Sequence, residues 1–298
     1  MNTKEVDSSG ELLKGGIDIH VHSGPGMIPR KLDHYEAAQL SLDAGIRALV
    51  LKDHHAMTTG AAYFINEYLM KGQGVRAYGA VCLNNTVGGL SPYTVDAAIK
   101  YGAKVVWFPT VSAENHIESH KDKEKKKGFP DAKGKPLPEK ALKIIDADGA
   151  LLSQVSEICD LIARGDVVLG TGHLSVPEIK VLIDEAKLRG VKRILVDHPE
   201  FTVNATIPEM VEFADKGAFI EHTCVIAIND ITTDYLIKMI KAVGAERTII
   251  SSDLGQTTQL YPVEGLKKVI KSLLDAGIKD DEIDLMFRKN PAALLGME

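Results

Sequence analysis

The sequence predicts an α/β fold, a closed (β/α)8 TIM barrel of parallel strands. Short apolar segments alternate with helical segments along most of the 298 residues. The apolar segments carry no polar alternation, which is typical of parallel strands that are covered on both faces. We count eight such units, and this number fits a closed barrel of about 250 residues or more better than an open sheet.

The first half of the chain shows the pattern clearly. An apolar run ends on His-Val-His, and a Ser-Gly-Pro-Gly segment then stops the strand. Each later apolar run likewise ends on polar residues, and a glycine such as Gly45 or Gly102 stops the helix. These signals predict strands at 17–22, 46–51, 75–83 and 103–108, with helices at 33–44, 59–70 and 92–101.

The alternation breaks at residues 112–152. This segment is polar and contains a lysine-rich run at 121–127 followed by three prolines. Around Asp146-Ala147-Asp148-Gly149, residues 141–145 and 150–152 predict a small β-hairpin with an Asp-Gly turn. We therefore expect a long insertion after the fourth strand. A solvated loop is the simpler interpretation of its lysine run, and a lid over the site is the alternative.

The alternation then resumes to the end of the chain. Glycines again stop the helices, for example Gly190, Gly217 and Gly244. The expected strands are 166–172, 193–196, 218–220 and 247–250, and the expected helices are 153–164, 177–188, 208–216, 232–243, 263–276 and 280–287, with a last short helix from Asn290-Pro291.

Composition limits the function classes. The net charge of -6 and the pI near 6 argue against a general nucleic-acid binder, which needs a basic face. No run approaches 18 apolar residues and the first 14 residues are polar, so we expect neither a membrane span nor a signal peptide. Three cysteines that lie far apart fit free thiols in the cytoplasm. We expect one domain over residues 1–298, a small-molecule substrate, and either a monomer or a homo-oligomer.

Most of the histidines gather where the expected strands end. Side chains alternate along a strand, so His20 and His22 point the same way, roughly 7 Å apart, and can bind one metal ion together. The carboxyl ends of barrel strands meet at the rim where TIM barrels place their active sites. Eight residues are expected at this rim: His20, His22, His54, His55, His173, His198, His222 and Asp253.

This residue set indicates metal chemistry. Imidazoles and one carboxylate suit zinc, although manganese, iron and nickel are alternatives. An ion held there would make a water acidic near neutral pH, and the Asp253 carboxylate could accept its proton. The sequence therefore predicts a divalent metal cofactor and a metal-activated water that attacks a carbonyl carbon, an amidine-like carbon or a phosphorus.

The chain resembles the amidohydrolase (metal-dependent hydrolase) superfamily over nearly its whole length. The pair His20 and His22 resembles the strand-one ligands, and His173 and His198 resemble the histidines of strands five and six. Asp253 resembles the strand-eight aspartate, and residues 290–296 are similar to the closing NPA-x-x-LG helix. The resemblance implies metal ligands at His20, His22, His173 and Asp253, with His198 either a further ligand or a group that polarises the substrate.

One departure from the superfamily affects the number of ions. Members with two metals use a carboxylated lysine or a glutamate at strand four as a bridge. Here residues 107–110 end that strand, and neither residue type follows until Glu114. One ion is therefore favoured and two stay open, with His54 and His222 as candidates for a second site.

Other residues near the rim are candidates for roles beside the ion. His198, His222 and Asp253 are catalytic candidates, as is Lys52, which could pair with Asp253, with Asp53 or with a substrate carboxylate. Three residues are candidates for substrate binding: Arg30, for which a surface role is equally plausible, His54 and Asn84. His34 lies on an expected helix and fits a packing or surface role.

The leading interpretation is a hydrolase that cleaves a C–N or C–O bond of a small amide, lactam or ester-like molecule, including cyclic ones. The same ligands would serve a decarboxylase or an isomerase, and hydrolysis of a phosphoester is a subordinate version of the first interpretation. A metal-binding barrel without catalysis is the least favoured alternative.

Overall fold

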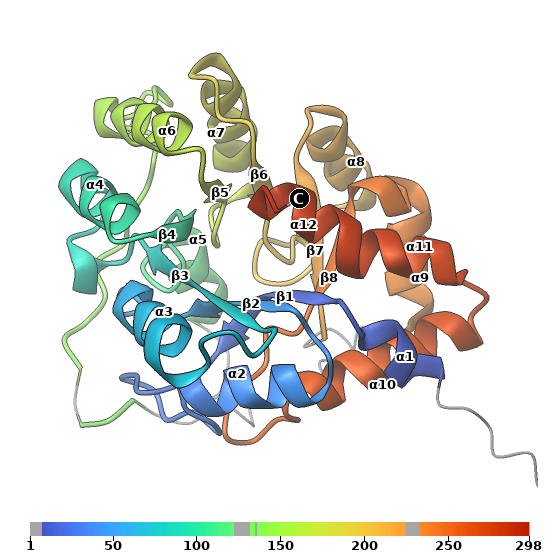
Figure 1. Cartoon of the computed structure of the whole chain (residues 1–298). Coiled ribbons are helices and arrows are strands. Elements are labelled where there is room, and N and C mark those ends of the chain that lie inside the picture. The colour runs from blue at the N-terminus through green and yellow to red at the C-terminus, as the bar shows by residue number, and fades with distance from the viewer. Residues whose placement is uncertain (1–7, 122–131, 135, 225–232, 298) are drawn as a thin grey trace, which may run out of the picture.

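The chain forms a parallel barrel, seen in a computed structural model that describes residues 8–121, 132–134, 136–224 and 233–297. Its sheet has the order β1-β2-β3-β4-β5-β6-β7-β8, with helices around it (Figure 1). The segment after β8 pairs with β1 through Val21 and Leu254, which closes the ring. The strands are β1 Ile17–His22, β2 Ala48–Lys52, β3 Arg76–Cys82, β4 Ala103–Trp107, β5 Val168–Gly170, β6 Ile194–Val196, β7 Phe219–Thr223 and β8 Thr248–Ser251. The predicted TIM barrel is confirmed.

The helices of the barrel also follow the prediction. They are α2 His34–Asp43, α3 Thr59–Phe64, α4 Pro92–Lys100, α6 Ser153–Gly165, α7 Val176–Leu188, α8 Ile207–Asp215, α9 Thr233–Val243, α10 Pro262–Asp275, α11 Asp280–Asp284 and α12 Asn290–Leu295. Two predicted helices continue as π-helical turns, at Ile65–Leu69 after α3 and at Leu285–Lys289 after α11. Short 3₁₀ turns lie at Asn85–Val87 and Ala245–Arg247.

Two short helices were not predicted. These are α1 Ser8–Leu13 and α5 Glu114–His120. Both are polar and too short to show a clear apolar period, which is the signal on which a helix prediction depends. Helix α5 matters for the site because it places His116 beside the rim.

The insertion after β4 is partly described. Ile145 and Leu151 form an antiparallel bridge, and the Asp146 amide donates to the Ala150 carbonyl at 2.8 Å. The predicted hairpin is therefore present in minimal form. Most of the lysine run, residues 122–127, lies outside the described residues, so the lid stays a prediction.

The barrel is filled by aliphatic side chains in its amino-terminal half. Ile19, Val50, Val105, Leu195 and Ile249 belong to one buried cluster there. Helix α12 covers this end of the barrel, where its Leu294 and Leu295 join the same cluster. A larger cluster packs the outer faces of the strands against the surrounding helices. None of the helices in the described ranges is long and apolar enough to cross a membrane.

Candidate functional site

A shift in register aims the β1 histidines into the barrel. The pairing of β1 with β2 shifts between Asp18 and Val21. Ile19 lies in the barrel interior, whereas Val21, two residues later, packs in an outer cluster. Strict alternation would put both side chains on one face of the strand. The shift in register therefore changes which residues of β1 point into the barrel. His20 and His22 consequently both face the interior, just above Ile19.

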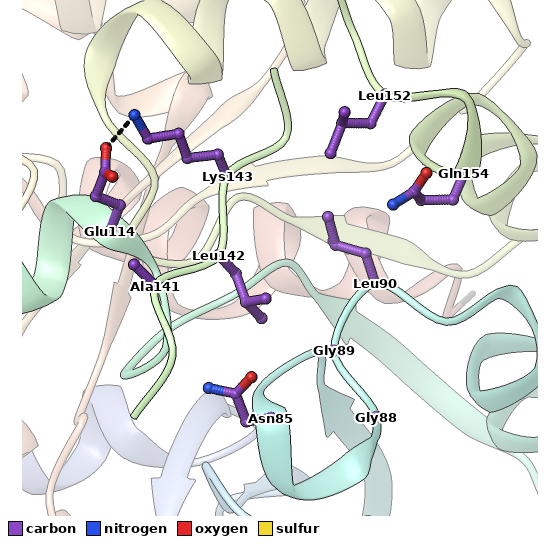
Figure 2. Close-up of a pocket in the computed structure, with 10 residues that line it drawn as sticks. All are labelled: Asn85, Gly88, Gly89, Leu90, Glu114, Ala141, Leu142, Lys143, Leu152 and Gln154. Atoms are coloured by element: carbon purple, nitrogen blue, oxygen red, sulfur yellow. Dashed lines mark ion pairs between the residues drawn. The ribbon is translucent and has the colours of Figure 1, made fainter. Parts of the chain in front are cut away.

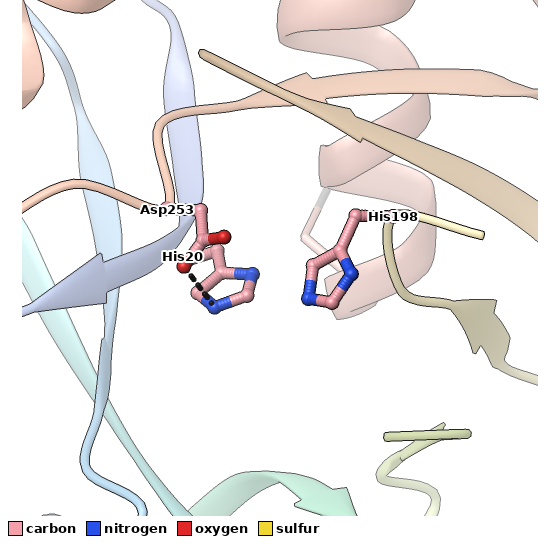
Figure 3. A group of neighbouring side chains, drawn as sticks. All are labelled: His20, His198 and Asp253. Atoms are coloured by element: carbon pink, nitrogen blue, oxygen red, sulfur yellow. Dashed lines mark ion pairs between the residues drawn. The ribbon is translucent and has the colours of Figure 1, made fainter. Parts of the chain in front are cut away.

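Four buried residues form what we call the ion cluster: His20, His22, His198 and Asp253. The Nε2 atoms of His20 and His22 lie 3.0 Å and 3.1 Å from the same Oδ1 of Asp253. One ligand atom each from His20, His198 and Asp253 lies within 4.8 Å of the other two (Figure 3). His20 Nε2 is buried and lacks an aligned hydrogen-bond partner among the described residues. This arrangement suits one cation shared by two imidazoles and a carboxylate.

The far nitrogens of the two β1 histidines are held by neighbours. His20 Nδ1 lies 3.1 Å from Oε1 of Glu221, and His22 Nδ1 donates to the backbone carbonyl of Lys52 at 3.1 Å. A held Nδ1–H fixes the tautomer and leaves Nε2 free to bind an ion. The sequence interpretation missed Glu221. Its signal was the alternation along β7, because Phe219 packs with the interior cluster and Glu221 is two residues further.

The charges of the cluster are strongly coupled. Burial lowers the pKa of His20, but the carboxylates of Asp253 and Glu221 outweigh it and raise the pKa to about 9. Burial, reinforced by the charge of Arg30, lowers the pKa of His22 to about 3. Burial would raise the pKa of Asp253, yet His20 and His22 hold it well below the usual range. Asp253 is therefore ionised at neutral pH, as a metal ligand must be.

The loop that carries Asp253 has an unusual backbone conformation. Asp253 has a φ of 51°, and its amide donates to the His20 carbonyl at 2.8 Å. Gly255 has a φ of 129°, and a Cβ there would lie 1.6 Å from the His22 carbonyl oxygen. His198 also has a positive φ, 26°. Non-glycine residues rarely adopt this region, and such residues gather at functional sites.

A second group of histidines lines the wall beside the ion cluster. His54 Nδ1 bonds Thr110 Oγ1 at 2.8 Å, and the His54 ring centroid lies 4.8 Å from that of His22. His173 Nδ1 lies 2.8 Å from Nδ1 of His116, and its ring centroid lies 5.1 Å from that of His198. His54 and His173 therefore lie next to the cluster, and their roles as ligands stay predictions.

A charged layer lies directly beneath the ion cluster. Lys52 is fully buried, and its Nζ lies 4.4 Å from the centroid of the Trp107 ring. Asp197 accepts from Trp107 Nε1 at 2.9 Å and from the Gly172 amide at 2.7 Å. Burial raises the pKa of Asp197, and the Lys52 charge opposes this rise. Within the described chain Lys52 forms no ion pair with Asp253 or Asp53, and its Nζ is buried without a hydrogen-bond partner, so its predicted catalytic role stays a prediction.

Two other predicted site residues are engaged with their neighbours. His222 Nδ1 lies 3.1 Å from Oε2 of Glu200, on the face of β7 opposite to Glu221. The Asn84 amide donates to the His54 carbonyl and to Thr110 Oγ1, and its Oδ1 accepts from backbone amides of residues 110 and 112. Asn84 thus fixes the end of β3 to the end of β4. The predicted catalytic role of His222 and substrate role of Asn84 stay predictions.

A cavity of about 540 Å³ lies away from the rim histidines (Figure 2). It is bounded by the loop after β3, by α5 and by the hairpin, and an ion pair of 2.6 Å between Glu114 and Lys143 lies at its edge. None of the rim histidines lines it. This cavity therefore adds no group to the ion cluster.

Sequence comparison identifies a family without an assigned function. The model described as "Family of unknown function (DUF6282)" matches residues 15–221, which is more than half of the chain. None of the curated proteins matches the sequence.

Solved structures with a similar fold cover nearly the whole chain. An amidohydrolase from Pseudomonas aeruginosa has a TM-score of 0.65 at 14% identity, covering 96% of this chain and 98% of that one. A probable dipeptidase from the same organism has a TM-score of 0.64 at 12% identity, covering 99% and 98%. A 2,6-dihydroxybenzoate decarboxylase from Rhizobium has a TM-score of 0.55 at 14% identity, covering 95% and 99%. At these identities the likeness concerns the fold, and it confirms the resemblance to amidohydrolase-type barrels at that level.

Proposed function

Since the chain belongs to DUF6282, a family of unknown function, we propose its activity from the site: a metal-dependent hydrolase that cleaves a C–N or C–O bond of a small molecule. One observation carries the proposal. The Nε2 atoms of His20 and His22 approach one oxygen of Asp253 while both Nδ1 atoms are held from behind. A carboxylate–histidine pair of this kind is the usual support of a metal-binding imidazole.

The ion cluster fits a divalent cation. Its nitrogen and carboxylate donors suit zinc first, with manganese, iron and nickel as alternatives. The buried Nε2 of His20 lies 3.0 Å from Asp253 Oδ1 without an aligned hydrogen bond, and a bound ion would give it a ligand bond. One ion is favoured because residues 107–110 at the end of β4 offer neither lysine nor carboxylate. A divalent ion held here would supply Lewis acidity and make a water acidic near neutral pH.

Residues of the chain would supply the other catalytic and positioning groups. Asp253 is ionised because its pKa is held well below the usual range, and its carboxylate lies where it could take the proton of the attacking water. His198 Nδ1 is buried without a hydrogen-bond partner in the described part of the chain, so His198 can donate to or orient a substrate oxygen. Glu221 keeps His20 in one tautomer. His54 and His173 form the wall against which the substrate would lie.

The substrate class follows from this chemistry. We propose a small amide, lactam or ester-like molecule, and similarity to an amidohydrolase and a probable dipeptidase supports a hydrolase. Decarboxylation is the second candidate, supported by the similarity to a 2,6-dihydroxybenzoate decarboxylase. Hydrolysis would yield a new carboxylate with an amine or alcohol, whereas decarboxylation would release CO₂. Three free, buried cysteines fit a reducing compartment, and we propose the cytoplasm as the place of action.

The test joins metal analysis to a substrate screen. The purified protein is stripped of metal, reloaded separately with zinc, manganese, iron or nickel, and assayed on lactams, lactones, hydantoin-like rings and N-acyl compounds. We expect His22→Ala to lose most of the bound metal and all turnover. His34→Ala is the control, because His34 bonds Ser23 and lies outside the ion cluster. Equal metal content in the two variants, or turnover by metal-stripped protein, would contradict the proposal.

A further inference from the structure

Arg30 is a partly buried cation with one buried donor that has no partner in the described part of the chain. Its Nε is buried and has no hydrogen-bond partner among the residues that the structure describes. Within the same residues no carboxylate lies within the 4.0 Å that defines an ion pair with it. A guanidinium carries five donors and stays charged at any physiological pH. A buried donor on a charged group is costly to leave without a partner, so Nε points to a group that binds there.

The backbone around Arg30 places it at the mouth of the ion cluster. Arg30 forms an isolated antiparallel bridge with Gln256, and the Lys31 amide donates to the Gly255 carbonyl at 2.8 Å. Both partners follow Asp253 by two or three residues. The loop after β1 is therefore tied to the loop that carries the carboxylate of the cluster.

The stem of Arg30 lies beside the carboxyl end of β1. A Cβ built on Gly24 would lie 3.6 Å from Cβ and 3.9 Å from Cγ of Arg30, and Gly24 follows His22 of the ion cluster by two residues. Arg30 is therefore placed beside both the end of β1 and the loop that carries Asp253.

The nearest acids leave Arg30 available. Asp53 is the acid that acts on it most strongly. Its Oδ1 accepts from the backbone amides of His55 and Ala56, at 2.6 Å and 3.1 Å, and its Oδ2 is buried without a hydrogen-bond partner, so that Asp53 makes no hydrogen bond to Arg30 among the described residues. Asp253 belongs to the ion cluster. Lys52, the other buried cation of the rim, likewise has no hydrogen-bond partner for its Nζ among the described residues, but its Nζ lies 4.4 Å from the centroid of the Trp107 ring, in the layer below the ion cluster. Of the two cations, Arg30 is the one on the loop that is tied to the loop carrying Asp253.

We propose that the substrate carries a carboxylate near its scissile bond and that the Arg30 guanidinium binds this carboxylate; the inference rests on the proposed hydrolase. A carboxylate matches the fork of a guanidinium through two parallel hydrogen bonds. A phosphate dianion would place a second negative charge near Asp53 and Asp253, so a monoanion fits better. Carboxylated amides such as N-acyl amino acids would be preferred over their neutral counterparts.

The binding test uses two pairs of probes, acetate with acetamide and benzoate with benzamide. Each is titrated by calorimetry into the zinc-loaded protein and into its Arg30→Gln and Arg30→Lys variants. We expect the wild type to bind benzoate at least about tenfold more tightly than benzamide. Arg30→Gln should weaken benzoate binding about 10- to 100-fold and leave benzamide nearly unchanged. Arg30→Lys should lie between, because it keeps the charge and loses the fork.

Controls separate the Arg30 contact from binding to the ion and from general charge. Arg76→Gln removes an exposed arginine at the start of β3, at the opposite end of the barrel, and should bind benzoate like the wild type. Zinc content is measured in every variant, and the titrations are repeated without metal. If Arg30→Gln is unstable, the comparison uses Arg30→Lys.

Three results would overturn the inference: no benzoate binding by the wild type, equal binding of benzoate and benzamide, or unchanged benzoate binding by Arg30→Gln at equal zinc content. Tighter binding of inorganic phosphate than of benzoate would also overturn it. Carboxylate binding through Arg30 without turnover of any amide or ester would leave the inference standing and contradict the hydrolase proposal alone.

Discussion

The barrel interior has two layers on the same strands, and they differ in chemistry. The aliphatic layer, nearer the amino ends, consists of Val50, Val105, Leu195 and Ile249, with the Phe219 ring packed against it. The polar layer lies two residues further along each strand and consists of Lys52, Asp197, Glu221 and Ser251, together with Trp107, whose ring also packs in the aliphatic cluster. The strands keep the same partners through both layers. One step along the barrel therefore changes its interior from apolar to charged.

This difference separates stability from function. Burying an aliphatic side chain contributes about 1.5 to 3 kcal/mol to folding. Burying charged groups such as Asp197 and Glu221 costs free energy that their partners only partly recover. The polar layer is accounted for by its contact with the ion cluster, because Glu221 bonds the proposed ligand His20 directly. Substitutions in the two layers should consequently affect different measurements.

The largest effect on stability is expected in the aliphatic layer. Leu195→Ala should lower the free energy of unfolding by about 2 to 5 kcal/mol, because it leaves a cavity in a fully buried site. Urea denaturation of metal-free protein measures this loss. The folded variant should still bind metal with nearly the wild-type affinity. A large loss of metal affinity in folded protein would mean that the layers are not separable.

Substitutions in the polar layer should affect metal binding more than stability. Glu221→Gln removes the carboxylate behind His20 and should weaken zinc binding about 10- to 100-fold, with a smaller change in unfolding free energy than Leu195→Ala. Glu200→Gln is the matched control, because Glu200 bonds His222 rather than a member of the ion cluster. Competition with a chelating dye gives both affinities. Equal losses in the two variants would argue against a special role for Glu221.

The sequence could predict those features of the two layers that repeat regularly along the chain. The eight strands were predictable because their apolar runs are short and regularly spaced. The convergence of His20, His198 and Asp253 followed from placing strand ends at one rim, and the structure brings these residues together. The register shift in β1 and the positive φ of Asp253 depend on tertiary contacts and leave no such signal.

The site residues that the sequence analysis did not identify were also overlooked for specific reasons. At the end of β7 the sequence offers both Glu221 and His222, and only the facing set by the closed barrel distinguishes them. Helix α5 is short and polar, so its His116 was not among the residues expected at the rim, although its Nδ1 lies 2.8 Å from Nδ1 of His173. Both omissions concern contacts between segments distant in sequence.

The pH dependence of metal binding sharpens the comparison further. In the metal-free protein the acids Asp253 and Glu221 outweigh burial and raise the pKa of His20 to about 9. His20 must lose a proton to bind an ion, so a lower pH weakens binding. The apparent zinc affinity should rise by up to about tenfold per pH unit from about pH 6 to pH 8. Proton release on zinc binding, measured in buffers of different ionisation enthalpy, checks this; binding without proton release would contradict it.

The smallest effect on zinc affinity is expected at the edge of the site. His116→Gln removes the imidazole that holds His173 Nδ1 but keeps a polar side chain on α5. Because His173 lies beside the ion cluster, we expect zinc affinity to fall by less than about tenfold, below the full range for a group directly behind a ligand. Zinc competition measures it. A loss as large as that of Glu221→Gln would instead place His173 among the principal ligands.

The most direct test is a crystal structure of the zinc-loaded protein with anomalous diffraction at the zinc edge. We predict one anomalous peak at about 2.0 to 2.2 Å from Nε2 of His20, Nε2 of His22 and a carboxylate oxygen of Asp253. A peak bound to other residues, with these three left without metal, would contradict the proposed centre.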